Sequence, residues 1–134
     1  MSLDNPSITA RASFTIRVIE TGGNRTLKVE DGNHRGGGNV YTRPGRTVSW
    51  VNGTGTTCAL SFRHLPDPDA EVPDGSPFWP FDEPMPAGCR KVLAGGEAWM
   101  PKLLPRLDVV VKYDVELPDR TDVPSLDPVI IVRP

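Results

Sequence analysis

Cysteine and histidine are scarce in this 134-residue chain, which has two of each. The two cysteines, Cys58 and Cys89, lack the Cys-x-x-Cys spacing of a zinc site, and they are too few for a disulfide framework. In a reducing compartment we expect both to be buried thiols, whereas an exported protein could join them in a disulfide. Their scarcity argues against a zinc protein and against a small disulfide scaffold.

Long apolar runs and an excess of one charge are also missing. No segment approaches the roughly 18 apolar residues of a membrane span, and the N-terminal residues contain no run long enough for a secretory signal. Fifteen basic and seventeen acidic residues give a net charge of -2, so no summed field attracts nucleic acid or an anionic membrane. We therefore expect a cytoplasmic protein without nucleic-acid or membrane partners.

Turn-forming residues, in contrast, are abundant, with 13 glycines and 15 prolines. This frequency is too high for long helices and suits short strands joined by turns. A chain of this length fits one domain with its own core. The composition predicts a single all-β domain over residues 1–134.

Alternation of apolar and polar residues marks the strands. The clearest segments are 13–18, 26–30, 47–52, 107–117 and 128–132. Seven or eight strands with turn signals between them, and no amphipathic helix, predict a Greek-key β-sandwich. The longest alternation, 107–117, is expected to form a central strand. We also expect a flexible N-terminal segment over 1–11 and a long proline-rich loop over 65–88.

Three segments, in this order, resemble cupredoxins, the blue-copper family. The first, 44–62, combines a Pro-Gly turn, an apolar strand and an asparagine loop; the second, 92–97, is similar to the family's turn of apolar residues followed by Gly-Glu. The third starts at Tyr113 and ends with the apolar strand 129–132. The resemblance covers about two thirds of the chain and implies a cupredoxin-like fold. An immunoglobulin-like sandwich is the alternative.

The copper ligands of that family are not matched. In cupredoxins a ligand histidine follows the asparagine by about six positions; here Trp50-Val51-Asn52 is followed by Cys58. The remaining ligands of the family lie in the loop before the last strand, and 116–127 contains no Cys, His or Met. Blue copper requires two imidazoles and a thiolate. We therefore predict a protein without a metal or cofactor.

A non-standard copper or redox site is the lesser alternative. Its ligands would come from scattered loop residues: Cys58, His64, Met85, Cys89 and Met100. A nucleophilic Cys-His pair is the sharpest enzyme hypothesis. If Cys58 and His64 share one strand, however, their spacing of about 3.3 Å per residue puts them about 20 Å apart. We therefore predict that the protein is not an enzyme.

The proline-rich loop carries the candidate ligand or partner surface, formed by Phe78, Trp79, Phe81, Asp82 and, at its start, His64. The three aromatic residues either cap the end of the core or present a platform for a sugar or a peptide. Capping is favoured, because three exposed aromatic side chains would promote aggregation.

The leading hypothesis is a non-enzymatic, metal-free, cupredoxin-like module that binds an unknown protein partner. A domain that binds carbohydrate or another small ligand through Phe78, Trp79 and Phe81 is the alternative. Nothing in the sequence selects a monomer over an oligomer.

Overall fold

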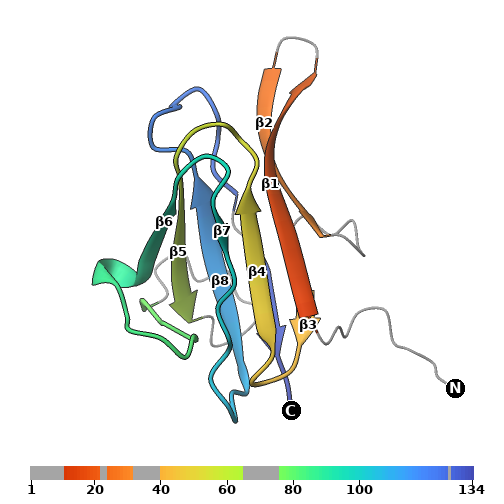
Figure 1. Ribbon diagram of the computed structural model, residues 1–134, viewed down its shortest axis with the longest axis vertical. Helices are drawn as coiled ribbons and strands as arrows, with labels where there is room; N and C mark the ends of the chain where they lie inside the picture. Colours follow the sequence, from red (N-terminus) through yellow and green to blue (C-terminus); the bar gives the residue numbers. More distant parts are fainter. Residues whose placement is uncertain (1–10, 22–23, 32–39, 65–75, 127) are drawn as a thin grey trace, which may run out of the picture.

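The computed structural model describes residues 11–21, 24–31, 40–64, 76–126 and 128–134. Within them nine strands form two sheets that face each other (Figure 1). The first sheet contains, in order, β2 (Asn24–Asp31), β1 (Arg11–Thr21), β4 (Thr47–Asn52) and β7 (Ala98–Trp99). The second contains β3 (Val40–Thr42), β9 (Val129–Val132), β8 (Val109–Glu116), β5 (Cys58–His64) and β6 (Arg90–Leu93). A single 3₁₀ turn, η1 (Ala87–Cys89), precedes β6.

The connections confirm the predicted all-β sandwich. β1 and β2 form the expected antiparallel hairpin, whereas β1 pairs with β4, and β3 with β9, in parallel. The chain therefore crosses repeatedly between two open sheets. The described residues form nine strands, whereas seven or eight were predicted. The shortest are β3, with three residues, and β7, with two. Strands this short show little alternation in a sequence.

The predicted central strand is confirmed as β8, which lies in the middle of the five-stranded sheet. Val111, Tyr113 and Val115 face the core as the alternation indicated. Val110, which the alternation places on the opposite face of the strand, is also buried. Of the predicted N-terminal segment, residues 1–10 lie outside the described residues, while Arg11 begins β1. No helix in the described ranges is long and apolar enough to cross a membrane.

Trp50, in the middle of β4, is the centre of the core. Its ring stacks on Trp99 of the neighbouring strand, with centroids 5.1 Å apart. Edge-on contacts reach Phe62 at 5.7 Å and Tyr113 at 5.5 Å in the opposite sheet, and Phe81 at 5.9 Å. The Trp50 indole N–H also donates to the Tyr113 hydroxyl at 3.4 Å. One side chain thus joins both sheets.

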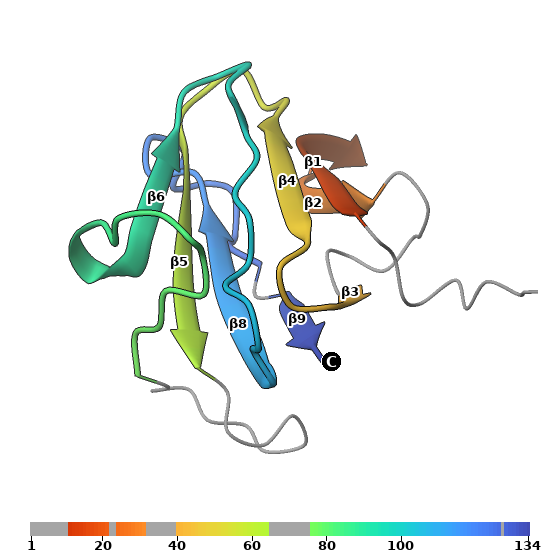
Figure 2. The ribbon, with the colours of Figure 1, turned by 60° about the horizontal axis from the view of Figure 1, so that its bottom comes forward.

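The described part of the segment between β5 and β6 closes one side of the sandwich. Figure 2 follows it in green from below β5 to the start of β6. Phe81 forms a β-bridge with Leu103. The indole N–H groups of Trp79 and Trp99 donate to the carbonyl and the carboxylate of Glu83, at 3.0 and 3.3 Å. These bonds satisfy two buried polar groups and fix the segment against the core.

Asn52, at the end of β4, joins the loops at the upper end of Figure 1. It is fully buried. Its side-chain nitrogen donates to the carbonyls of Thr56, Leu93 and Ala94 at 2.7, 3.0 and 3.1 Å. Its side-chain oxygen accepts from the backbone N–H and the hydroxyl of Thr54. One amide therefore ties the β4–β5 loop to the β6–β7 loop.

The two loops also touch through their backbones. A Cβ atom on Gly95 would lie 3.0 Å from the backbone carbon of Gly55, a distance that only glycine permits. The β6–β7 loop and the β4–β5 loop therefore touch at Gly95 and Gly55.

The opposite end of the sandwich begins with the predicted Pro-Gly turn. The Arg46 N–H donates to the Arg43 carbonyl at 3.3 Å, and Gly45 has a φ of 75°, as a type II turn requires. Backbone bonds join this turn to the segment before β8, from Gly45 to Leu104 at 3.2 Å and from Leu103 to Arg46 at 2.9 Å.

Replacing Asn52 tests the importance of the upper loop contact. Asn52→Ala is expected to lower the free energy of unfolding by about 3 kcal/mol, because buried carbonyls lose their donor. Thr57→Ala is the matched control; among the described residues the Thr57 side chain makes no hydrogen bond, and we expect a loss below about 0.5 kcal/mol. Urea denaturation measures both, and equal small losses would contradict the role given to Asn52.

Candidate functional site

Cys58, the residue at the position that resembles a copper-ligand histidine, begins β5 directly after the Asn52-bound loop. Its side chain is fully buried and faces the core beside Leu93, its cross-strand neighbour on β6. We call the end of the sandwich that carries the β4–β5, β6–β7 and β8–β9 loops the Cys58 end. There Cys58 is a packing residue beneath the loops.

The surroundings of Cys58 hold its thiol in the protonated form. Burial, together with the negative charge of Glu97, raises the pKa of Cys58 to about 11, and a hydrogen bond with the Leu93 backbone opposes this only in part. A thiolate is the form that attacks electrophiles and binds metals. At neutral pH the raised pKa therefore makes Cys58 a poor nucleophile.

The donors around Cys58 do not fit a blue-copper centre. Such a centre requires two imidazoles and a thiolate, with a weak thioether. The described ranges contain no group of three or more His, Cys, Asp or Glu side chains that could hold a metal ion. The β8–β9 loop supplies no Cys, His or Met, and Met85 and Met100 are 66% and 72% exposed. Among the described residues, the donors at the Cys58 end thus do not assemble the trigonal ligand set of the family.

The second cysteine does not pair with the first. Both Cys58 and Cys89 are free and buried. Arg90 lies opposite Ser61 on β5, so Cys89 lies about four residues, or about 13 Å, along the sheet from Cys58. That separation exceeds the reach of a disulfide. Of the two alternatives that the sequence left open, the structure has buried thiols.

Cys58 and His64 occupy the two ends of β5, as the spacing argument expected. His64 is half-buried; its backbone N–H donates to Ser76, and its ring lies 5.8 Å from that of Phe78. No proton can pass directly between the thiol and this imidazole.

Two of the three aromatic side chains of the proline-rich loop lie in the core, the arrangement that the sequence favoured over a ligand platform. Trp79 is 9% exposed and Phe81 is 2% exposed. Both rings contact Phe62 and Trp99, so they cap the core. Phe78 is half-buried. Burying these rings against Phe62 and Trp99 removes their apolar surface from water, which stabilises the fold.

Of the predicted surface residues, Asp82 alone is exposed. Its backbone N–H donates to the Lys102 carbonyl at 2.7 Å, which places it beside the segment before β8. His64 lies at the same end of the sandwich, at the end of β5. The remainder of the predicted loop, 65–75, lies outside the described residues.

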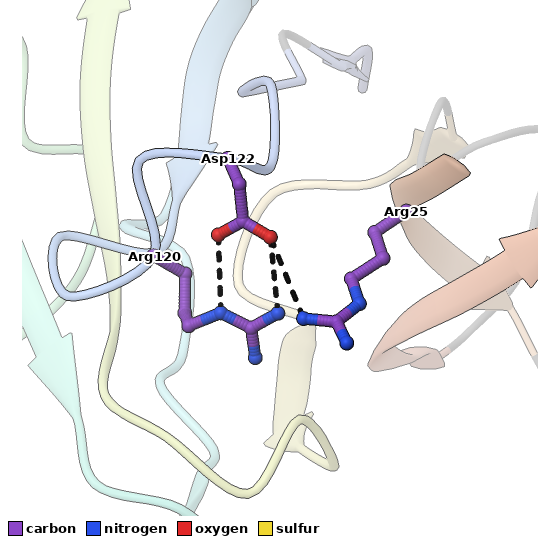
Figure 3. Close-up of polar contacts among 3 residues, drawn as sticks. All are labelled: Arg25, Arg120 and Asp122. Atoms are coloured by element: carbon purple, nitrogen blue, oxygen red, sulfur yellow. Dashed lines mark hydrogen bonds and ion pairs between the residues drawn. The ribbon is translucent and has the colours of Figure 1, made fainter. Parts of the chain in front are cut away.

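An ion-pair cluster at the Cys58 end was missed by the sequence argument. Arg120 donates to both carboxylate oxygens of Asp122 at 3.2 Å, and Arg25 of β2 approaches the same carboxylate at 3.5 Å (Figure 3). The hydrogen bond from Arg120 is the main cause that lowers the pKa of Asp122. The contact joins the β8–β9 loop to the β1–β2 hairpin. Arg120 and Asp122 are neighbours in the sequence, but only the fold brings Arg25 to them, so no sequence spacing could have shown the cluster.

Comparison with solved structures finds multicopper oxidases, which contain cupredoxin-like domains. The McoA multicopper oxidase 2F4 variant from the hyperthermophile Aquifex aeolicus is 18% identical, with a TM-score of 0.52 over 99% of this chain and 30% of its own. A multicopper oxidase from Campylobacter jejuni is 13% identical, with a TM-score of 0.52 over 98% and 27%. The multicopper oxidase mgLAC is 14% identical, with a TM-score of 0.51 over 92% and 38%.

These similarities show the fold of the chain, which is cupredoxin-like, as the sequence resemblance implied. The chain spans only 27% to 38% of the length of these oxidases. No protein-family model and no curated protein matches the sequence.

The pKa of Cys58 predicts how stability depends on pH. Folding raises this pKa from 9.0 to about 11, so between these values the unfolded chain releases a proton that the folded protein keeps. The stabilising contribution is complete below pH 9 and is lost as the pH rises to about 11. We expect the free energy of unfolding of the wild type, relative to Cys58→Ala, to fall across this window. Urea denaturation of both proteins measures it; a constant difference would show that Cys58 titrates normally.

Proposed function

We propose that this chain is a non-enzymatic, metal-free, cupredoxin-like module that binds a protein partner. One observation carries the proposal: the position that resembles the first copper ligand holds Cys58, whose thiol is buried and protonated. The chain has a cupredoxin-like fold, and at the position of that ligand its side chain packs in the core.

The separation of Cys58 and His64 along β5 supports the non-enzymatic part of the proposal. General-base activation of a thiol requires hydrogen-bond contact between the two groups. The buried free thiols also fit a reducing compartment, so a cytoplasmic location belongs to the same proposal.

A protein partner is favoured over a sugar or another small ligand. Stacking on a sugar needs exposed aromatic faces, and Trp79 and Phe81 keep theirs in the core. The large exposed apolar side chains are instead dispersed: Tyr41, Val51, Met85, Val92 and Met100. Single exposed apolar residues are ordinary on protein surfaces and form no stacking platform for a sugar.

Copper titration of the reduced protein tests the proposal. We expect no stoichiometric complex in native mass spectrometry and no intense thiolate-to-copper absorption, because Cys58 is buried and His64, the histidine that the structure describes, lies at the other end of β5. The Cys58→Ala variant is the matched control and should give the same result. A stoichiometric complex whose absorption disappears in Cys58→Ala would replace the proposal with a copper or redox protein.

A further inference from the structure

Of the eight arginines whose side chains the structure describes, five have a carboxylate within reach. Arg25 and Arg120 share Asp122, and three more pairs have N–O distances between 2.9 and 3.4 Å. These three pairs are Arg63–Asp114, Arg90–Glu116 and Arg133–Asp108. Exposed cations without a carboxylate partner therefore differ from these five arginines.

Four basic residues at the end opposite Cys58 differ from this pattern. Arg43, Arg46, Lys102 and Arg106 are all exposed. Their side chains make no hydrogen bond or ion pair in the part of the chain that the structure describes. Because the whole chain has a net charge of -2, this group is a local excess of positive charge on a slightly acidic protein.

Backbone contacts hold the four residues in one place. Arg43 and Arg46 are the first and last residues of the Pro-Gly turn, which bonds to Leu104. Lys102 forms a bridge with Thr47, next to Arg46. Arg106 follows Leu104 by two residues. We call this surface, formed by the 43–46 turn and residues 102–106, the basic end.

The backbone of the basic end is also strained at one cation. Arg106 has a φ of 64°, a conformation that glycine or asparagine adopts more easily.

We propose that the basic end binds an acidic segment of a protein partner. This inference rests on the proposed function and names its surface and the chemistry of its partner. Guanidinium groups bind carboxylates through two parallel hydrogen bonds, and three of the four cations are arginines. Tyr41, 47% exposed on β3, is two residues from Arg43, and tyrosine and arginine are enriched at protein interfaces.

The composition of this end favours a carboxylate-rich protein segment over nucleic acid. Four free cations are fewer than the roughly six to ten phosphate contacts of a typical DNA-binding surface. Asp82, which bonds to Lys102 through its backbone, and Asp108, which pairs with Arg133, lie at its margins, so the surface of unpaired cations is short. A short acidic segment can bind between them.

Fluorescence anisotropy with a labelled peptide of alternating aspartate and glutamate tests the inference. The peptide should bind the wild type at low salt and more weakly at an ionic strength of about 0.15 M. The variant R43Q/R46Q/R106Q should bind about tenfold more weakly, because three exposed charge pairs are lost. The matched control R25Q/R90Q/R120Q removes the same number of positive charges elsewhere and should bind as the wild type does. Near-ultraviolet circular dichroism checks that both variants are folded.

Three results would overturn the inference: no binding of the peptide at low salt, equal weakening in both variants, or tighter binding of a labelled DNA oligonucleotide of the same charge. The failure of the proposed function is a separate outcome, since it is decided by copper binding at the Cys58 end.

Discussion

The packing of Trp50 is the constraint on which the rest of the structure depends. Its ring contacts Trp99 in its own sheet, Phe62 and Tyr113 in the other, and Phe81 in the segment that closes the side. Aromatic pairs of this geometry add to the stabilisation from buried area. These rings fill the space between the two sheets. The binding surface that we propose therefore lies at an end of the sandwich and not in its interior.

The same strand determines what the Cys58 end can do. Asn52 lies two residues after Trp50 on the inward face of β4, and its amide closes the loops above Cys58. With these loops joined and Glu97 nearby, the thiol stays protonated. The opposite end carries unpaired cations on two bonded turns. In the proposed account, the Cys58 end of this cupredoxin-like scaffold serves packing and the basic end serves binding.

Local patterns in the sequence predicted the fold well where the structure itself is local. The alternation around Tyr113 gave the central strand, and the Pro-Gly pair at Gly45 gave the turn. The direction of Trp79 and Phe81 was less accessible, because it depends on contacts with Phe62 and Trp99, which are distant in the sequence. The basic end was not predicted at all, since Arg43 and Arg106 become neighbours only when two turns far apart in the sequence bond to each other.

The most direct test of the account is the alkylation rate of Cys58, measured by iodoacetamide labelling and peptide mass spectrometry in folded and urea-unfolded protein. A buried thiol whose pKa is raised to about 11 should remain unlabelled until the protein unfolds. Rapid labelling of Cys58 in the folded protein would contradict this account, because it would show an accessible thiolate at the position that resembles a copper ligand.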